Sequence, residues 1–199
     1  MITEHFTALE TAVERSRSAV PVIDGWGRHL AGVLAGGGRL LACGNGGSAA
    51  EAQHLTAELV GRFRDERIPL SAISLHCDTS ALTALVNDYG EDEMFARGVR
   101  AHGRRGDVLI GLSTSGSSRN VLTAVKAAHA VGMRTWALTG PAPNALAAMC
   151  DDAICVEAQS TATVQEIHLM LVHALCMAVD AALEAAGVKE AAGVKGGVS

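Results

Sequence analysis

The sequence predicts an α/β fold, with three layers around a doubly wound, parallel, five-stranded sheet. Five short apolar runs follow one another between residues 39 and 156, and a helical pattern lies between successive runs. This alternation is typical of parallel βαβ units. Only 3% of the 199 residues are aromatic, so small aliphatic side chains must fill a close-packed core. The chain is long enough for one full-sized core and short for two.

The expected elements follow the chain in order. Spaced apolar positions over residues 3–33, interrupted near Pro21, predict helices that precede the sheet. The apolar runs predict strands at 39–43, 70–75, 107–112, 134–138 and 153–156. The stretches between them predict helices, joined by right-handed crossovers, at 49–61, 79–86, 94–102, 120–130 and 145–149.

A long C-terminal helix is expected over residues 163–186. Its apolar residues almost encircle it, so it must be covered on several sides, and an oligomer interface would supply part of that cover. The residues after it are rich in Gly and Val with little to pack. We therefore expect a helical extension over 1–35, the sheet domain over 36–186 and a flexible tail over 187–199.

Composition excludes several classes of partner. The formal charge is -5 and no cluster of Lys and Arg occurs, so the electrostatic footprint of a nucleic-acid binder is missing. Five scattered cysteines without a Cys-x-x-Cys pair indicate neither a disulfide framework nor a thiolate zinc site, and they suit a reducing cytoplasm. The N-terminus has no apolar signal segment, and the longest apolar run, residues 169–179, is too short to span a bilayer.

A glycine-rich loop follows the first predicted strand and leads into a helix with two polar groups. The loop carries Asn45, Gly46, Gly47 and Ser48, and we expect Ser48 to cap the helix. His54 and Glu58 stand four residues apart and so share one helix face. Such a pair is more often a solvated ion pair than a site, so the spacing alone leaves both interpretations open.

A second loop, after the third predicted strand, is crowded with hydroxyl groups. Four serines and a threonine occupy the six residues from 113 to 118, immediately before a helix. At the carboxyl edge of a parallel sheet, backbone N–H groups and the helix dipole favour an anion. A helix cap needs only one hydroxyl. We therefore favour a phosphate site over a simple cap.

The first loop also permits an alternative function. Gly44, Gly46 and Ala49 fit the Gly-x-Gly-x-x-Gly/Ala pattern of dinucleotide-binding loops. A ribose-binding acidic residue is then required near the end of the second strand, and Asp78 lies only loosely there. An NAD-dependent oxidoreductase remains an alternative at this stage.

Other polar residues have both an ordinary and a functional interpretation. The final helix carries Gln165, Glu166, His168 and His173 among apolar residues, and buried polar groups require partners. Gln165 and His173 are about 12 Å apart along the helix axis, so spacing does not demand a shared metal. We expect His168 to be a core or interface histidine. The pair Asn87 and Asp88 fits a turn, and Arg62 fits the surface.

Taken together, these motifs resemble the phosphoheptose isomerase family of the sugar isomerase (SIS) fold. The resemblance extends from the N-terminal helices to about residue 186 and implies a flavodoxin-like sheet in a homotetramer, with active sites at subunit interfaces. It implies an aldose-ketose isomerase that converts sedoheptulose 7-phosphate to D-glycero-D-manno-heptose 7-phosphate through an enediol, the first step of nucleotide-heptose biosynthesis. Non-catalytic, protein-binding relatives look altered at catalytic positions, whereas this chain retains Glu58 and His173.

The resemblance also implies roles for individual residues. One zinc ion per subunit would be bound by His54, Glu58, Gln165 and His173. Glu58 and His173 would also transfer protons. The phosphate would be held by Ser113, Thr114, Ser115 and Ser118, and the sugar by Asn45, Gly46, Gly47, Ser48, Glu58, Asn87, Asp88 and Gln165.

Two departures from the family pattern lie near the expected site. Thr163 stands where members commonly carry a basic residue, and residues 141–144 replace a glycine-rich turn. We expect these changes to bear on heptose selectivity and loop mobility.

Overall fold

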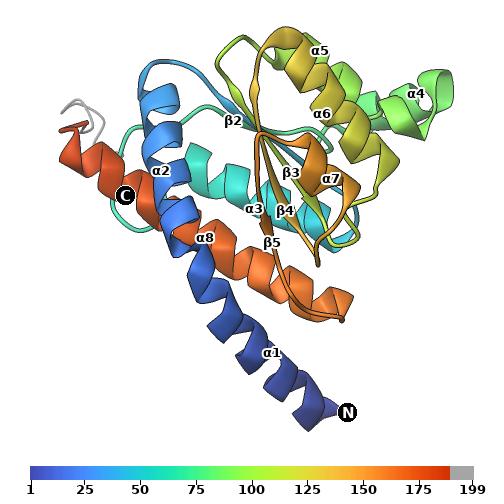
Figure 1. The fold of residues 1–199 in the computed structure, drawn as a ribbon. Helices are drawn as coiled ribbons and strands as arrows, with labels where there is room; N and C mark the ends of the chain where they lie inside the picture. The colour runs from blue at the N-terminus through green and yellow to red at the C-terminus, as the bar shows by residue number, and fades with distance from the viewer. Residues whose placement is uncertain (189–199) are drawn as a thin grey trace, which may run out of the picture.

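The computed structural model describes residues 1–188 and confirms the expected parallel sheet (Figure 1). The strands are in the order β2-β1-β3-β4-β5, and all neighbours run parallel. They are β1 (Leu40–Gly44), β2 (Ala72–Ser74), β3 (Val108–Ser113), β4 (Arg134–Thr139) and β5 (Asp152–Cys155). This is the flavodoxin-like order, in which the direction of winding reverses between β1 and β3.

The helices lie close to their predicted positions. In chain order they are α1 (Ile2–Ser16), the short 3-10 helix η1 (Arg17–Ala19), α2 (Val20–Ala35), α3 (Gly47–Val60), α4 (Thr79–Tyr89), the 3-10 helix η2 (Glu91–Glu93), α5 (Ala96–His102), α6 (Arg119–Val131), α7 (Ala145–Met149) and α8 (Thr161–Ala185). The break between α1 and α2 falls at η1, with Pro21 in the first turn of α2, where its missing N–H costs nothing.

Two local expectations were wrong. Asn87 and Asp88 do not form a turn, because α4 continues to Tyr89 and ends at Gly90, whose φ is +83°. Ser48 does not cap α3, because the helix begins at Gly47, two residues earlier than expected, and Gly46 is its N-cap. Gly46 has a φ of +55°, a backbone conformation that glycine adopts without strain.

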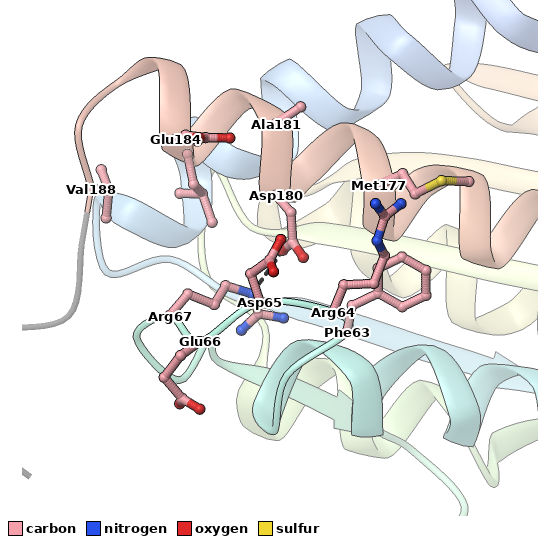
Figure 2. A pocket seen from close by; sticks show the side chains of 11 residues that line it. Phe63, Arg64, Asp65, Glu66, Arg67, Met177, Asp180, Ala181, Glu184 and Val188 are labelled. Carbon is pink, nitrogen blue, oxygen red and sulfur yellow. Dashed lines mark hydrogen bonds and ion pairs between the residues drawn. The ribbon is translucent and has the colours of Figure 1, made fainter. Parts of the chain in front are cut away.

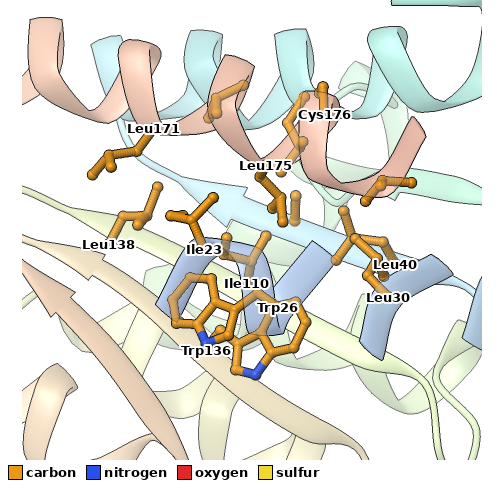
Figure 3. Packing of buried hydrophobic residues seen from close by; sticks show 14 of the residues in the cluster. Ile23, Trp26, Leu30, Leu40, Ile110, Trp136, Leu138, Leu171, Leu175 and Cys176 are labelled. Carbon is orange, nitrogen blue, oxygen red and sulfur yellow. The ribbon is translucent and has the colours of Figure 1, made fainter. Parts of the chain in front are cut away.

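Two apolar layers enclose the sheet. The helices α2, α3 and α8 cover one face, and α5, α6 and α7 cover the other. In the first layer the indole rings of Trp26 and Trp136 stack with centroids 4.7 Å apart (Figure 3). The Trp26 Nε1–H also donates to Asp152 at 2.8 Å, so a large aromatic residue fixes α2 to the sheet in a core otherwise built from small side chains.

The helix α8 is a core helix. Its 25 residues, with a mean hydropathy of 1.6 over its most apolar window, would suffice by length and composition to cross a membrane, so the expectation that this segment is too short was wrong. Here α8 packs on α2 and α3, and Leu171, Leu175 and Cys176 point into the core (Figure 3). The predicted tail over 187–199 lies almost wholly outside the described residues.

The topology brings the two functional loops together. Gly44 at the end of β1 is paired with Leu112 near the end of β3. The loop that leads into α3 and the loop that leads into α6 therefore leave the same edge of the sheet, at the point where the winding reverses. Ligands of doubly wound folds bind at this point.

Candidate active site

The loop after β1 brings its backbone close to α8. A Cβ on Gly47 would lie 2.5 Å from Nε2 and 2.8 Å from Oε1 of Gln165, so only glycine leaves room for the amide. A Cβ on Gly44 would meet the backbone of Ser48 at 2.7 Å, and the side chain of Ser48 is buried. The glycines therefore let α3 start directly above the strand and let Gln165 reach its first turn.

Asn45 is held in place by a residue that the sequence did not indicate. Its side-chain amide exchanges two hydrogen bonds with the amide of Asn120, at 2.9 and 2.8 Å. Asn120 lies in the first turn of α6, directly after the hydroxyl-rich loop. This pairing links the two loops across the sheet edge, and only the strand order could have revealed it.

The hydroxyl groups of the second loop bond to one another. Ser113 Oγ lies 3.0 Å from Ser118 Oγ and 3.4 Å from Ser115 Oγ, and Ser117 Oγ–H donates to Ser115 Oγ at 3.1 Å. Ser118 is the N-cap residue of α6, yet within the described chain its side chain forms no capping bond. The hydroxyls are thus clustered at a helix N-terminus without being used as caps, an arrangement that suits an anion.

The turn at residues 141–144, which differs from the family pattern, supports the hydroxyl-rich loop. Asn144 caps α7 by accepting from the Ala147 N–H at 2.9 Å, and its side chain leaves no room for a Cβ on Gly116. The Leu146 N–H also donates to the Gly116 carbonyl at 2.9 Å. The turn therefore braces the hydroxyl-rich loop, and Gly116, with a φ of +61°, is the residue that allows the contact.

Three of the predicted site residues converge between α3 and α8. The Nε2 atoms of His54 and His173 lie 2.9 Å apart, so one imidazole donates to the other. The same His54 nitrogen lies 3.3 Å from Glu58 Oε1. The side chain of His54 is 41% exposed and that of Glu58 is 20% exposed, so a ligand can reach the cluster. An acid and a base from two helices thus face one small volume.

The donors in this cluster are of the kind that zinc prefers. Two imidazole nitrogens on one tetrahedral zinc ion lie about 3.3 Å apart, given bonds of about 2.0 Å, and the observed separations of 2.9 and 3.3 Å are close to that value. Among residues 1–188, however, no group of three or more His, Cys, Asp or Glu side chains is arranged to hold a metal. The donor types fit, but the two imidazoles face each other and would have to separate slightly.

The other predicted residues are placed less centrally. Asn87 and Asp88 lie on α4, exposed to solvent, and bond to each other at 2.8 Å. Arg62 forms a long 4.0 Å ion pair with Glu66 on the surface, as expected. Asp78, which a dinucleotide site would need for a ribose, instead caps α4 by accepting from the Ala81 N–H at 3.0 Å. The NAD-dependent oxidoreductase alternative therefore has no acidic residue at Asp78 to bind a ribose.

A second buried polar pair lies behind the cluster. His168 is a core histidine, as expected, and its Nε2–H donates to the Thr139 carbonyl at 3.1 Å. Its Nδ1 faces Glu51 Oε2 at 3.7 Å. Glu51 is 8% exposed and precedes Glu58 by two turns of α3. The sequence did not mark Glu51, because its burial depends on how α3 crosses α8.

The comparisons with known proteins agree with the fold. The pattern of the SIS domain family matches residues 4–140. The chain is 64% identical to a phosphoheptose isomerase of Streptomyces coelicolor over 92% of this chain and 79% of that protein, and 50% identical to one of Thiobacillus denitrificans over 95% and 97%. A solved phosphoheptose isomerase from Neisseria gonorrhoeae is 43% identical and superposes with a TM-score of 0.84, over 90% of this chain and 97% of that one.

Proposed function

The chain belongs to the phosphoheptose isomerases of the SIS domain family, and on that premise we propose that Glu58 and His173 transfer the protons of its reaction. It is an isomerase of sedoheptulose 7-phosphate. The observation that carries the assignment is the convergence of Glu58 and His173 on His54, within 3.3 Å, from two different helices.

The chemistry requires one base and one acid on either side of the reacting carbons. A base removes the proton from C1 of the ketose while an acid protonates the carbonyl oxygen at C2, which gives an enediol. Return of a proton to C2, with loss of the proton from the C1 oxygen, gives the aldose. A carboxylate and an imidazole suit these roles near neutral pH. The glycine-rich loop beside them lets the sugar approach the backbone closely.

The phosphate belongs on the hydroxyl-rich loop. We assign Ser113, Thr114, Ser115 and Ser118 to the phosphate because the three serine hydroxyls gather at the N-terminus of α6 and the loop offers donors without adding charge. Asn45, Gly46, Gly47, Ser48, Glu58 and Gln165 then line the sugar between this loop and the His–Glu cluster. Fixing the phosphate positions the substrate and contributes to the rate through orientation.

Zinc is the cofactor that this donor set fits. We assign His54, Glu58, Gln165 and His173 as the residues that hold it, one ion per subunit. When bound, zinc would polarise a carbonyl oxygen and stabilise negative charge that develops on it. The Gln165 amide lies beside Gly47, about two turns of α3 before His54, so it would have to extend toward the other three residues to complete the set.

We further propose a cytoplasmic homotetramer with sites at subunit interfaces. The helix α1 projects away from the body of the subunit (Figure 1), and Ile2 and Phe6 on it are 72% and 62% exposed. No residue of α4 is buried within the described chain. A neighbouring subunit that covers α4 would enclose Asn87 and Asp88, the remaining sugar ligands that we assign. The division into an extension over 1–35, a domain over 36–186 and a tail stays a prediction.

The assignment is tested by two substitutions. Glu58→Gln and His173→Ala each remove one proton-transfer group and should abolish isomerisation of sedoheptulose 7-phosphate, followed by NMR, while the tetramer persists in analytical ultracentrifugation. Substantial turnover by either variant would refute the assignment. Loss of the tetramer together with activity would show an effect on assembly instead.

A further inference from the structure

Arg67 is a buried cation that completes the C-terminal end of α3. Its side chain is 7% exposed. Nη2 donates to the Glu58 carbonyl at 2.6 Å and Nη1 to the Leu59 carbonyl at 2.9 Å. Nη1 also lies within 3.3 Å of the carbonyls of Gly61 and Ile68. The last carbonyls of a helix have no partner inside it, and the helix dipole favours a cation there. Arg67 thus holds the backbone of the residue that we assign to proton transfer.

The same guanidinium is bound to α8. Its Nε–H donates to Asp180 Oδ1 at 2.8 Å (Figure 2), and Asp180 follows His173 by two turns on the same face of α8. Cys176 lies between them, and the pKa of its thiol is raised to about 12 by burial and then by the carboxylates of Glu58 and Asp180. These groups therefore lie together where α3 crosses α8.

On the outer side of the crossing between α3 and α8, no close-packed side chains of residues 1–188 cover the hydrogen bonds of Arg67. A hollow of about 520 Å³ opens there, between residues 63–67 and α8 (Figure 2), and both Arg67 and Asp180 line it. Phe63 also lines the hollow, and its ring centroid lies 5.7 Å from that of His173. Leu59 and Val179 pack the inner side of the crossing in the buried core, so on its open outer side it is the hydrogen bonds of Arg67 and Asp180 that join α3 to α8.

We propose that Arg67 and Asp180 are positioning residues that set the placement of Glu58 relative to His173. The proposal rests on the assigned roles of Glu58 and His173. Within residues 1–188, Arg67 reaches Glu58 only through its backbone carbonyl and forms no hydrogen bond to either imidazole of the cluster. Its effect therefore falls on the geometry of proton transfer, whereas the phosphate and sugar loops lie at the other end of α3.

The test is a separation of kcat from KM. Arg67→Lys keeps the positive charge, but an ammonium group cannot span the helix carbonyls and the carboxylate at once. A misplacement of about 1 Å costs on the order of 100-fold in rate, so we expect kcat to fall about 10- to 100-fold. Glu58 is one of several residues that we assign to the sugar, so KM should rise by no more than about 2-fold. Asp180→Asn keeps the shape of its side chain and should lower kcat in the same direction by less.

Arg39→Lys is the matched control. Arg39 pairs with the buried Asp107 at 3.4 Å, at the edge of the sheet opposite the two loops, so its variant should keep the wild-type kcat. An unchanged kcat in folded Arg67→Lys, or a loss confined to KM, would overturn the proposal. If Arg67→Lys does not fold, the same measurement is made on Asp180→Asn: a lower kcat supports the proposal, and an unchanged kcat or a loss confined to KM overturns it. Turnover by Glu58→Gln would overturn the proposed function itself, whereas an inactive Glu58→Gln beside a fully active Arg67→Lys overturns only the positioning role.

Discussion

Substitution of Gly47 by alanine separates the site from the stability of the fold. The added Cβ would lie 2.5 Å from Gln165 Nε2. Non-bonded heavy atoms settle at about 3.5 Å, so the amide must retreat by about 1 Å. The obstacle is the end of a flexible side chain, and Gly47 is a helical residue, so alanine strains neither the backbone nor the core.

We therefore expect Gly47→Ala to melt within about 3 °C of the wild type while kcat/KM falls by about 100-fold, since a displacement of about 1 Å at a reacting centre has that effect. The assay is isomerisation of sedoheptulose 7-phosphate followed by NMR, with thermal unfolding measured on the same samples. Gly32→Ala is the matched control, because it is a helical glycine with no described atom within 4 Å of the added Cβ. It should be fully active and at least as stable as the wild type.

Wild-type kcat/KM in Gly47→Ala would refute the placement of Gln165 in the site. A fall in melting temperature as large as that expected for a core substitution would show that the clash is not confined to the amide. Either result would contradict the reasoning from the structure.

Three further predictions concern the core and its titrating groups. Trp136→Ala removes an indole that is 2% exposed and stacked on the second tryptophan, and should lower the free energy of unfolding in urea by about 3–5 kcal/mol; a loss below about 1 kcal/mol would contradict the packing. Cys43 and Cys176 are fully buried, and burial raises the pKa of both thiols to about 12. A disulfide reagent at pH 8 should therefore label them only after unfolding. Labelling of either thiol in the native protein, read by peptide mass spectrometry, would contradict this burial. Burial would raise the pKa of Asp151, but hydrogen bonds from Thr135 lower it below its ordinary 3.8, so this carboxylate stabilises the fold above that pH and loses its effect as the pH falls through the lowered value. Asp151→Asn should therefore reduce the melting temperature at pH 7 and match the wild type near pH 2, whereas an equal difference at both pH values would count against it.

Much of the fold could be predicted because its signals are local. The apolar runs are short and regularly separated, so strands such as 134–138 and helices such as Ala145–Met149 were found within a residue or two. The exceptions are also local in origin. Asn and Asp are frequent turn residues, but Asn87 and Asp88 continue the helix α4. Serine is a good N-cap residue, but the N-cap of α3 is Gly46, two residues before Ser48.

The site could be predicted only in part, because its supporting contacts join distant segments. His54 and Glu58 were visible from their helical spacing. By contrast, Asn120 is 75 residues from Asn45, and Arg67 is 113 residues from Asp180. Neither pair has a sequence signal, since an Asn in a first turn and an Arg after a helix are common surface residues. Strand order and the crossing of α3 with α8 decide that these groups meet.

The central claim is that Glu58 and His173 move protons through an enediol. The most direct measurement is NMR of sedoheptulose 7-phosphate incubated in D2O with the wild type and with Glu58→Gln. The wild type should yield the aldose with deuterium at C2, because the proton taken by the base exchanges with solvent, and the variant should yield neither product nor exchange. Turnover by Glu58→Gln at the wild-type rate, or a product that keeps the substrate proton entirely, would contradict the account.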